Sequence, residues 1–251
     1  MNDTGYAFRT EQLTRLFSGF KAVNDVSIEI PTGGVRTIIG PNGAGKTTFF
    51  NLLSGLLPPS SGRIFFAGRD ITALPPYQRV RLGMARSFQI TNIFARLTVR
   101  ENIRLSAQAA YDGRASFFFP SRSMSDLGGR TALILQDVGL TSRANDLAEN
   151  LSHGDQRRLE IGCVLARDAH VLLLDEPLAG MSPAETQSTV DLIVRIAQGR
   201  TILLVEHDID VVMAISTTIT VLQSGAVLAV GTPQEIRANA AVQRAYLGDL
   251  A

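Results

Sequence analysis

A glycine-rich loop that ends in lysine and threonine is the segment of this sequence with the clearest chemical meaning. The glycines of such a loop allow backbone N–H groups to turn towards the β- and γ-phosphates of a nucleotide, and the following helix points its partial positive end at the same anion. Lys46 would place a charge on the phosphates, and the Thr47 hydroxyl would reach Mg²⁺. The pattern predicts a nucleoside triphosphate site, which kinases, GTPases and motor proteins also have. The segment that fits G-x-x-x-x-G-K-[ST], with the threonine after it, is Gly40, Pro41, Asn42, Gly43, Ala44, Gly45, Lys46, Thr47 and Thr48.

An apolar run that ends in two carboxylates is the second candidate. Residues 171–174 read Val-Leu-Leu-Leu, and Asp175 and Glu176 follow directly. A buried parallel strand delivers the residues at its carboxyl end to the ligand crevice. We expect Asp175 to reach the metal, directly or through water, and Glu176 to accept a hydrogen bond from the attacking water as general base. A solvated turn after a core strand is the alternative, and the glycine-rich loop favours the catalytic interpretation.

Both segments need a scaffold, and the sequence predicts an α/β P-loop NTPase core with a largely parallel sheet. Short apolar β-rich runs alternate with helical stretches, and the N-terminal segment 26–30 is expected to be antiparallel. Capping boxes predict helix starts at 182–185 and 232–235. The other expected elements are strands at 37–40, 63–67, 170–174 and 201–206, helices at 46–57 and 208–215, and a hairpin of 218–222 with 227–230.

The stretch between the two candidate segments is different, because it has few strand signals. Helical patterns at 99–110 and 130–138 flank a polar patch that contains Phe117–Phe119. We interpret residues 1–251 as a single domain, with a core at about 1–88 and 169–251 and an inserted α-helical lobe at about 89–168.

Composition excludes several classes of protein. The 24 Lys+Arg and 23 Asp+Glu residues leave a net charge of +1, which gives no support to an extended nucleic-acid surface. The single cysteine, Cys163, fits a reducing compartment and is most simply a core residue. The first residues lack a signal-peptide pattern, and no apolar run approaches the ~18 residues that a transmembrane helix needs. If the protein serves a membrane process, we expect another chain to span the membrane.

Residues 151–156, Leu-Ser-His-Gly-Asp-Gln, resemble the L-S-G-G-Q signature loop of the ABC ATPase family. The resemblance covers essentially the whole chain and implies ATP and Mg²⁺ as ligands. It implies that Ser152, His153 and Gly154 bind the γ-phosphate of a nucleotide held by the glycine-rich loop of a second ATPase subunit, either an identical chain or a similar one. His153 and Asp155 depart from the commonest signature. We expect the helix after the signature to begin at Asp155.

The same resemblance implies further site residues. Gln89 would contact Mg²⁺ and the attacking water, and His207 would donate to the γ-phosphate and help to hold Glu176. Phe17 would stack on adenine, although a core role is nearly as well supported and Phe20 is a competitor. Ser182 replaces the usual aspartate of the family's D-loop, and it is also explained as a helix N-cap.

Within the family, three segments are similar to the ATPases of branched-chain amino acid importers: 86–94, 178–185 and 245–248. This implies transmembrane permease subunits as partners, indirectly a substrate-binding protein, no nucleic acid, and a peripheral position on the cytoplasmic face of the inner membrane. A urea or amide importer and a lipopolysaccharide exporter stay open as alternatives. Ile93, Phe94 and Leu97 are candidate permease contacts, unless they pack inside the lobe, and Phe117–Phe119 invites the same two interpretations.

Three functions from other classes also remain. A non-transport ABC ATPase that acts on DNA or the ribosome would need coiled coils or a second ATPase domain. A small-molecule kinase would leave the signature-like residues and His207 unexplained. A module that binds ATP without hydrolysing it is disfavoured by Glu176, the candidate general base.

Overall fold

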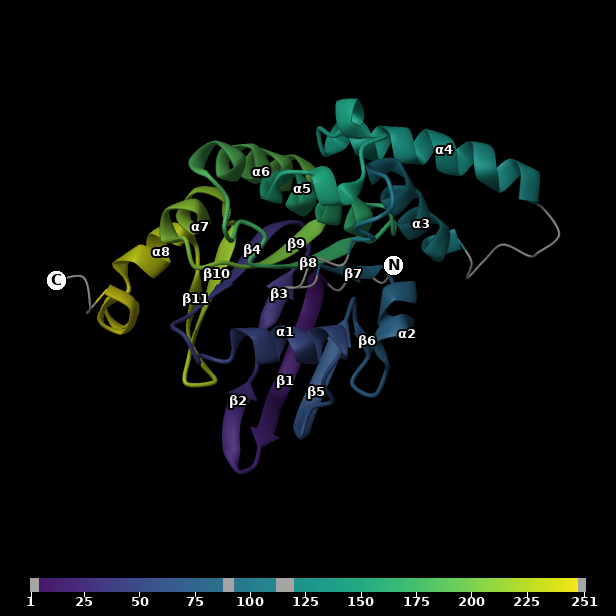
Figure 1. The fold of residues 1–251 in the computed structure, drawn as a ribbon. Coiled ribbons are helices and arrows are strands. Elements are labelled where there is room, and N and C mark those ends of the chain that lie inside the picture. The colour runs from purple at the N-terminus through teal and green to yellow at the C-terminus, as the bar shows by residue number, and fades with distance from the viewer. Residues whose placement is uncertain (1–4, 88–92, 112–119, 248–251) are drawn as a thin grey trace.

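The computed structural model describes residues 5–87, 93–111 and 120–247. Within these ranges, a six-stranded sheet with the order β11-β10-β4-β9-β8-β7 forms the centre of the fold (Figure 1). All neighbouring strands are parallel except β10 and β11, which form the expected hairpin. The strands are β4 (Gly34–Ile39), β7 (Met84–Arg86), β8 (Val171–Asp175), β9 (Thr201–Val205), β10 (Thr218–Gln223) and β11 (Ala226–Gly231).

A second, antiparallel sheet is built around β1 (Tyr6–Phe17). The prediction of one antiparallel segment at 26–30 is wrong in detail. These residues are divided between the end of one strand and the start of another, with Ser27 and Ile28 between the two. There, hydroxyl groups accept hydrogen bonds from the backbone: Ile28 N donates to Thr10 Oγ1 at 3.2 Å, and Gln12 N donates to Ser27 Oγ at 2.8 Å. The other strands are β2 (Phe20–Val26), β3 (Glu29–Pro31), β5 (Ser61–Phe66) and β6 (Arg69–Asp70).

Helix α1 (Lys46–Ser54) lies between the two sheets, as its buried residues and Figure 1 agree. Phe49 and Leu53 belong to one apolar cluster with residues of β1 and β5 on one side and of β4, β8 and β9 on the other. The helix ends before residue 57, where we expected its end. Gly55 stops it in the left-handed conformation at φ 80°, and the buried Arg79 donates to the Leu52 and Leu53 oxygens.

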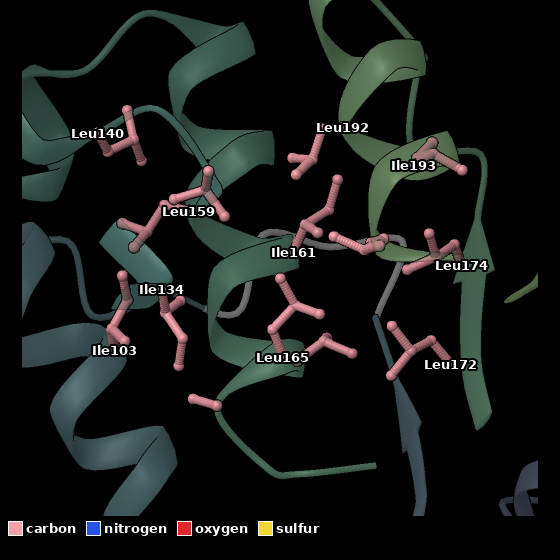
Figure 2. Close-up of a cluster of buried hydrophobic side chains, with 14 of the residues drawn as sticks. Ile103, Ile134, Leu140, Leu159, Ile161, Leu165, Leu172, Leu174, Leu192 and Ile193 are labelled. Carbon is pink, nitrogen blue, oxygen red and sulfur yellow. The ribbon is translucent and has the colours of Figure 1, made fainter. Parts of the chain in front are cut away.

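Helices α5 (His153–Leu165) and α6 (Pro183–Ile196) cover the opposite face of the central sheet (Figure 1). Figure 2 shows how α5 joins this face to helices α3 (Val99–Tyr111) and α4 (Pro120–Asp137). Leu159, Ile161 and Leu165 of α5 lie between Ile103 on α3 and Leu172 on β8, in one buried cluster. A continuous apolar core therefore connects the helical segment to the strand that carries Asp175.

Short helices complete the described chain. Ser182 and Thr232 both form the expected capping boxes, with Glu185 and Glu235 respectively.

None of the helices in the described residues combines the length and the hydropathy needed to cross a bilayer. The remaining elements are α2 (Pro76–Arg81), α7 (Ile209–Ile215), α8 (Pro233–Ala238), α9 (Ala240–Val242), two 3₁₀ turns (Thr141–Arg143 and Ala148–Asn150) and a π-helical turn (Gln243–Leu247).

Candidate nucleotide-binding site

The glycine-rich loop connects the buried strand β4 to the start of α1. A Cβ atom on Gly40 would lie 2.3 Å from the Leu222 oxygen, and one on Gly45 would lie 2.3 Å from the Ala22 oxygen. Gly45 also has φ 98°, in the left-handed region. Glycine is therefore required at both positions for the loop to pack against β10 and β2 while its backbone turns into the helix.

Lys46 is the first residue of α1, and its ammonium group lies across the loop. The Nζ atom donates to the Gly40 oxygen at 2.6 Å and to the Pro41 oxygen at 3.1 Å. Burial lowers the pKa of Lys46, and the negative charges of Glu176 and Asp175 partly offset this effect. Because β4 and β8 both pair in parallel with β9, Lys46 and the two carboxylates lie at the same edge of the sheet.

Asp175 is the last residue of β8 and is almost completely buried. Its Oδ2 atom accepts a hydrogen bond from Arg86 at 3.1 Å, while Oδ1 is buried and has no hydrogen-bond partner among the described residues. Burial raises the pKa of Asp175, and the charge of Arg86 opposes that shift. A buried oxygen with an open acceptor position, beside a phosphate loop that ends in Thr47, fits the hard oxygen ligands that Mg²⁺ prefers.

Glu176 has a backbone conformation that L residues seldom adopt, with φ 48°. Its N–H donates to the Val205 oxygen at 2.9 Å, so the residue is held against the end of β9. Glu176 is partly exposed, whereas the preceding Asp175 is buried. Non-glycine residues in this region are often functional, because such strain persists only where the surroundings enforce it.

Glu206 and His207 follow β9 and complete the group of charges. Glu206 is buried, and its carboxylate accepts hydrogen bonds from Leu178 N at 3.0 Å and His207 N at 3.1 Å. Burial raises the pKa of Glu206, and the charge of Glu176 raises it further. The His207 ring is exposed, with Nδ1 3.6 Å from the Glu206 carboxylate. Sequence reasoning missed Glu206, although a carboxylate directly after an apolar strand was the signal that identified Asp175.

Arg86 is a second residue that sequence reasoning missed. It lies on β7, and its guanidinium donates to Asn51 Oδ1 and Ser54 Oγ on α1, both at 2.7 Å, as well as to Asp175. Arg86 thereby connects the candidate metal-binding carboxylate to the helix that follows the phosphate loop. A charged residue in the middle of the stretch Met84-Ala85-Arg86-Ser87 was the available signal.

The signature-like residues form a separate group. Ser152 is the N-cap of α5, and its side chain accepts a hydrogen bond from Asp155 N. The expected helix start at Asp155 is therefore wrong, because this cap allows α5 to begin at His153. Ser152 Oγ donates to Glu185 at 3.2 Å, and the His153 ring packs against Gly180. Ser152 and Gly154 thus lie against Glu185 in the first turn of α6, and His153 lies against Gly180 in the segment before it, whereas Lys46 interacts with Glu176 and Asp175.

The remaining candidates are divided between described and undescribed residues. Phe17 ends β1 with 41% of its surface exposed, and Phe20 is 65% exposed, so both are available for stacking. The guanidinium of Arg15 lies 4.7 Å from the centre of the Phe17 ring. Gln89 and Phe117–Phe119 lie outside the described residues.

Four further residues were assigned structural or docking roles, and one of them, Leu97, is partly buried. Phe94 is exposed, whereas Ile93 packs against the main apolar cluster, so the expected apolar surface is only partly exposed. Cys163 also packs against that cluster, and burial raises the pKa of its thiol to about 11.

A glycine-rich loop before α1, with carboxylates at the ends of neighbouring parallel strands, defines a P-loop nucleotide-binding protein. Comparison with protein families narrows the class. The ABC transporter family model matches residues 23–179, and a model of the branched-chain amino acid ATP-binding cassette transporter matches residues 226–251. The chain therefore belongs to the ABC transporter family and is an ATP-binding protein of that family, as the signature-like loop predicted.

Relatives from several organisms agree with this assignment. The high-affinity branched-chain amino acid transport ATP-binding protein LivG of Salmonella typhimurium is 43% identical over 240 residues, which cover 93% of this chain and 94% of LivG. BraF of Pseudomonas aeruginosa, which has the same description, is 40% identical, with coverage of 94% and 96%. The lipopolysaccharide export system ATP-binding protein LptB of Acidithiobacillus ferridurans is 34% identical, with coverage of 95% and 96%.

Solved structures show the same fold. The ADP conformation of MJ1267, an ATP-binding cassette of an ABC transporter, matches with a TM-score of 0.84 at 28% identity, over 98% of this chain and 100% of that chain. CbiO1 from Clostridium perfringens, part of an ABC transporter complex, matches with a TM-score of 0.82 at 28% identity, over 98% and 97% of the two chains.

Proposed function

We propose that the chain hydrolyses ATP and that the energy drives a membrane transporter. The observation that carries this proposal is the shared position of Lys46, Asp175 and Glu176 at one edge of the central sheet: the loop with Lys46 follows β4, the two carboxylates end or follow β8, and both strands pair in parallel with β9. A cation for the phosphates, a carboxylate for the metal and a carboxylate for water are the parts that phosphoryl transfer to water requires.

The residues divide the chemistry among them. The loop Gly40–Thr48 binds the phosphates through its N–H groups and Lys46, and Glu176 orients the water for in-line attack. Thr47 and Asp175, with Gln89, would hold Mg²⁺, which neutralises charge that develops on the phosphates. His207 donates to the γ-phosphate.

The catalytic unit in this proposal is a head-to-tail pair of chains. Ser152 donates to Glu185 at the start of α6, whereas Lys46 donates to Gly40 and Pro41 of its own loop, which fits a signature loop that serves the nucleotide of a partner. The partner is an identical chain or a similar one. In either pair, each of two ATP molecules lies between the phosphate loop of one chain and the signature loop of the other.

Replacement of the general base tests hydrolysis. Glu176→Gln removes the charge but keeps the size, so the variant should bind ATP, remain paired and lose almost all turnover. Phosphate release and sedimentation velocity, each with ATP and Mg²⁺, measure the two properties. Turnover at the wild-type rate would refute the role of Glu176.

The proposed cargo is branched-chain amino acids, supported by the names of the LivG and BraF relatives and the C-terminal match. A lipopolysaccharide exporter is the weaker candidate, supported by LptB at 34% identity, and a urea or amide importer remains the third. Uptake of labelled leucine and of labelled urea into vesicles that contain this chain with the permeases encoded beside it distinguishes the two import candidates. Uptake of urea but not leucine would overturn the proposed cargo.

The proposed partners are permease subunits and, through them, a substrate-binding protein. In such a complex the chain would lie peripherally on the cytoplasmic face of the inner membrane. Apolar side chains support a docking surface: Leu56, Val80 and Phe94 are 45%, 37% and 60% exposed. Leu56 and Val80 line a pocket that also contains Arg86, the partner of Asp175. A permease segment in this pocket would contact a residue that is bonded to the proposed metal ligand.

A further inference from the structure

Glu185 makes two sets of contacts, of which the capping box explains only one. Its Oε2 atom accepts hydrogen bonds from Ser182 N at 3.0 Å and Ser182 Oγ at 2.7 Å, which cap α6. Its Oε1 atom accepts one from Ser152 Oγ at 3.2 Å, and a Cβ atom on Gly154 would lie 2.5 Å from Oε1, so the carboxylate also lies directly against Gly154. Glu185 therefore lies between the first turns of two helices, α5 and α6.

The surroundings of Glu185 favour a negative charge. The Ser182 side chain and backbone, then Ser152 and Gly154, lower the pKa of its carboxyl group, so Glu185 is ionised at neutral pH. The N-termini of α5 and α6 add their partial positive charges. A carboxylate of this chain thus lies where the signature loop offers its hydroxyl and N–H donors.

Those donors are the two that the proposed function assigns to the γ-phosphate of the partner's nucleotide. A serine hydroxyl has one proton to donate, and so does a backbone amide. Ser152 and Gly154 therefore cannot bind Glu185 and a phosphate oxygen in the same geometry at once.

We propose that Glu185 is a positioning residue that occupies the anion site of the signature loop in the separate chain and is exchanged for the partner's γ-phosphate when two chains close on ATP. The inference rests on the proposed function. Before closure, the carboxylate keeps Ser152 and Gly154 oriented as a pair of donors. During closure it must give up both contacts and remain near a phosphate of like charge, so Glu185 raises the ATP concentration at which chains pair.

The chain contains a matched control for the test. Glu235 forms the same capping box with Thr232 on α8, at N–O distances of 2.8 Å for Thr232 N and 3.3 Å for Glu235 N. Its box lies on a helix that packs with β10 and β11. A glutamine at either position can cap the helix through its carbonyl oxygen, but at 185 its NH₂ group cannot accept from Ser152 or Gly154.

The experiment uses the full chain with Glu176→Gln, which removes hydrolysis, and measures dimer formation by sedimentation velocity as ATP·Mg²⁺ is increased. Glu185→Gln in this background should lower the ATP concentration for half-maximal pairing by about threefold or more, because two like charges no longer meet. Glu235→Gln should leave that concentration unchanged. Thermal melting without nucleotide should show a larger decrease for Glu185→Gln than for Glu235→Gln, because only Glu185 also contacts the start of α5.

The outcomes separate the inference from the function on which it rests. An ATP-dependent dimer whose midpoint is unchanged or raised by Glu185→Gln would overturn the inference and leave the proposed function standing. A midpoint lowered equally by Glu235→Gln would also overturn it. Failure of Glu176→Gln alone to pair in ATP would contradict the proposed function and the inference together. Glu185→Ala, which cannot bond to Ser152 in any rotamer, should lower the midpoint as Glu185→Gln does.

Discussion

Breaking the ion pair between Arg86 and Asp175 should destabilise the protein strongly even without nucleotide. The side chains of these residues are 8% and 0% exposed, and their N–O distance is 3.1 Å. Removal of one partner of a buried pair costs about 3 kcal/mol, at the lower end of the usual range because Lys46 also offsets the charge of Asp175. The bonds from Arg86 to Asn51 and Ser54 contribute about 1 kcal/mol each. Arg86→Met should therefore lose about 5 kcal/mol of unfolding free energy.

A double-mutant cycle isolates the pair. Arg86→Met with Asp175→Asn leaves no buried unpaired charge at this position, so the double variant should be more stable than the single arginine variant. The coupling energy should be at least about 2 kcal/mol, measured by urea unfolding in the presence of a chelator. Additive effects of the two substitutions would refute the argument that Arg86 stabilises the charge of Asp175.

Two further predictions concern residues that hold the loop and the strand ends. Arg79→Ala should lower the unfolding free energy by about 3 kcal/mol, because it removes a buried guanidinium that donates to four backbone oxygens. Urea unfolding measures this loss of stability, and a loss below about 1 kcal/mol would contradict the prediction. The raised pKa of Glu206 means that its contribution to stability is fully present below its unfolded pKa and is lost as pH rises through its folded pKa. The unfolding free energy of the wild type minus that of Glu206→Gln should therefore fall as the pH rises above about 4.5, the ordinary pKa of a glutamate, and a rise would contradict this sign.

The parts of the site that the sequence predicted are those in which chemistry and conformation are encoded locally. The loop from Gly40 to Thr47 combines close backbone approaches with a helix start, and Asp175 is the last residue of a fully buried strand. The capping boxes are also local, since each needs only residues three apart in sequence. Fold class and family could therefore be inferred before any tertiary contact was known.

Residues whose roles depend on distant partners were missed. Arg86 contacts Asp175, which is 89 positions away, and Glu185 contacts Ser152, which is 33 positions away. The end of α1 was also missed, since Arg79 and Gly55 together stop a helix that the sequence pattern alone would extend. In each case the determining neighbour comes from another element, which no local pattern reveals.

The shared site is the central claim, and mixing two inactive chains tests it most directly. Lys46→Ala disables the phosphate loop, and Ser152→Ala disables the signature loop. A mixed pair has one intact site, made of the loop of one chain and the signature of the other, so an equimolar mixture of two nearly inactive variants should recover roughly a quarter of wild-type ATPase activity if pairs form at random. Activity in the mixture no higher than the mean of the two variants, under conditions where mixed pairs are shown to form, would contradict a site built from two chains.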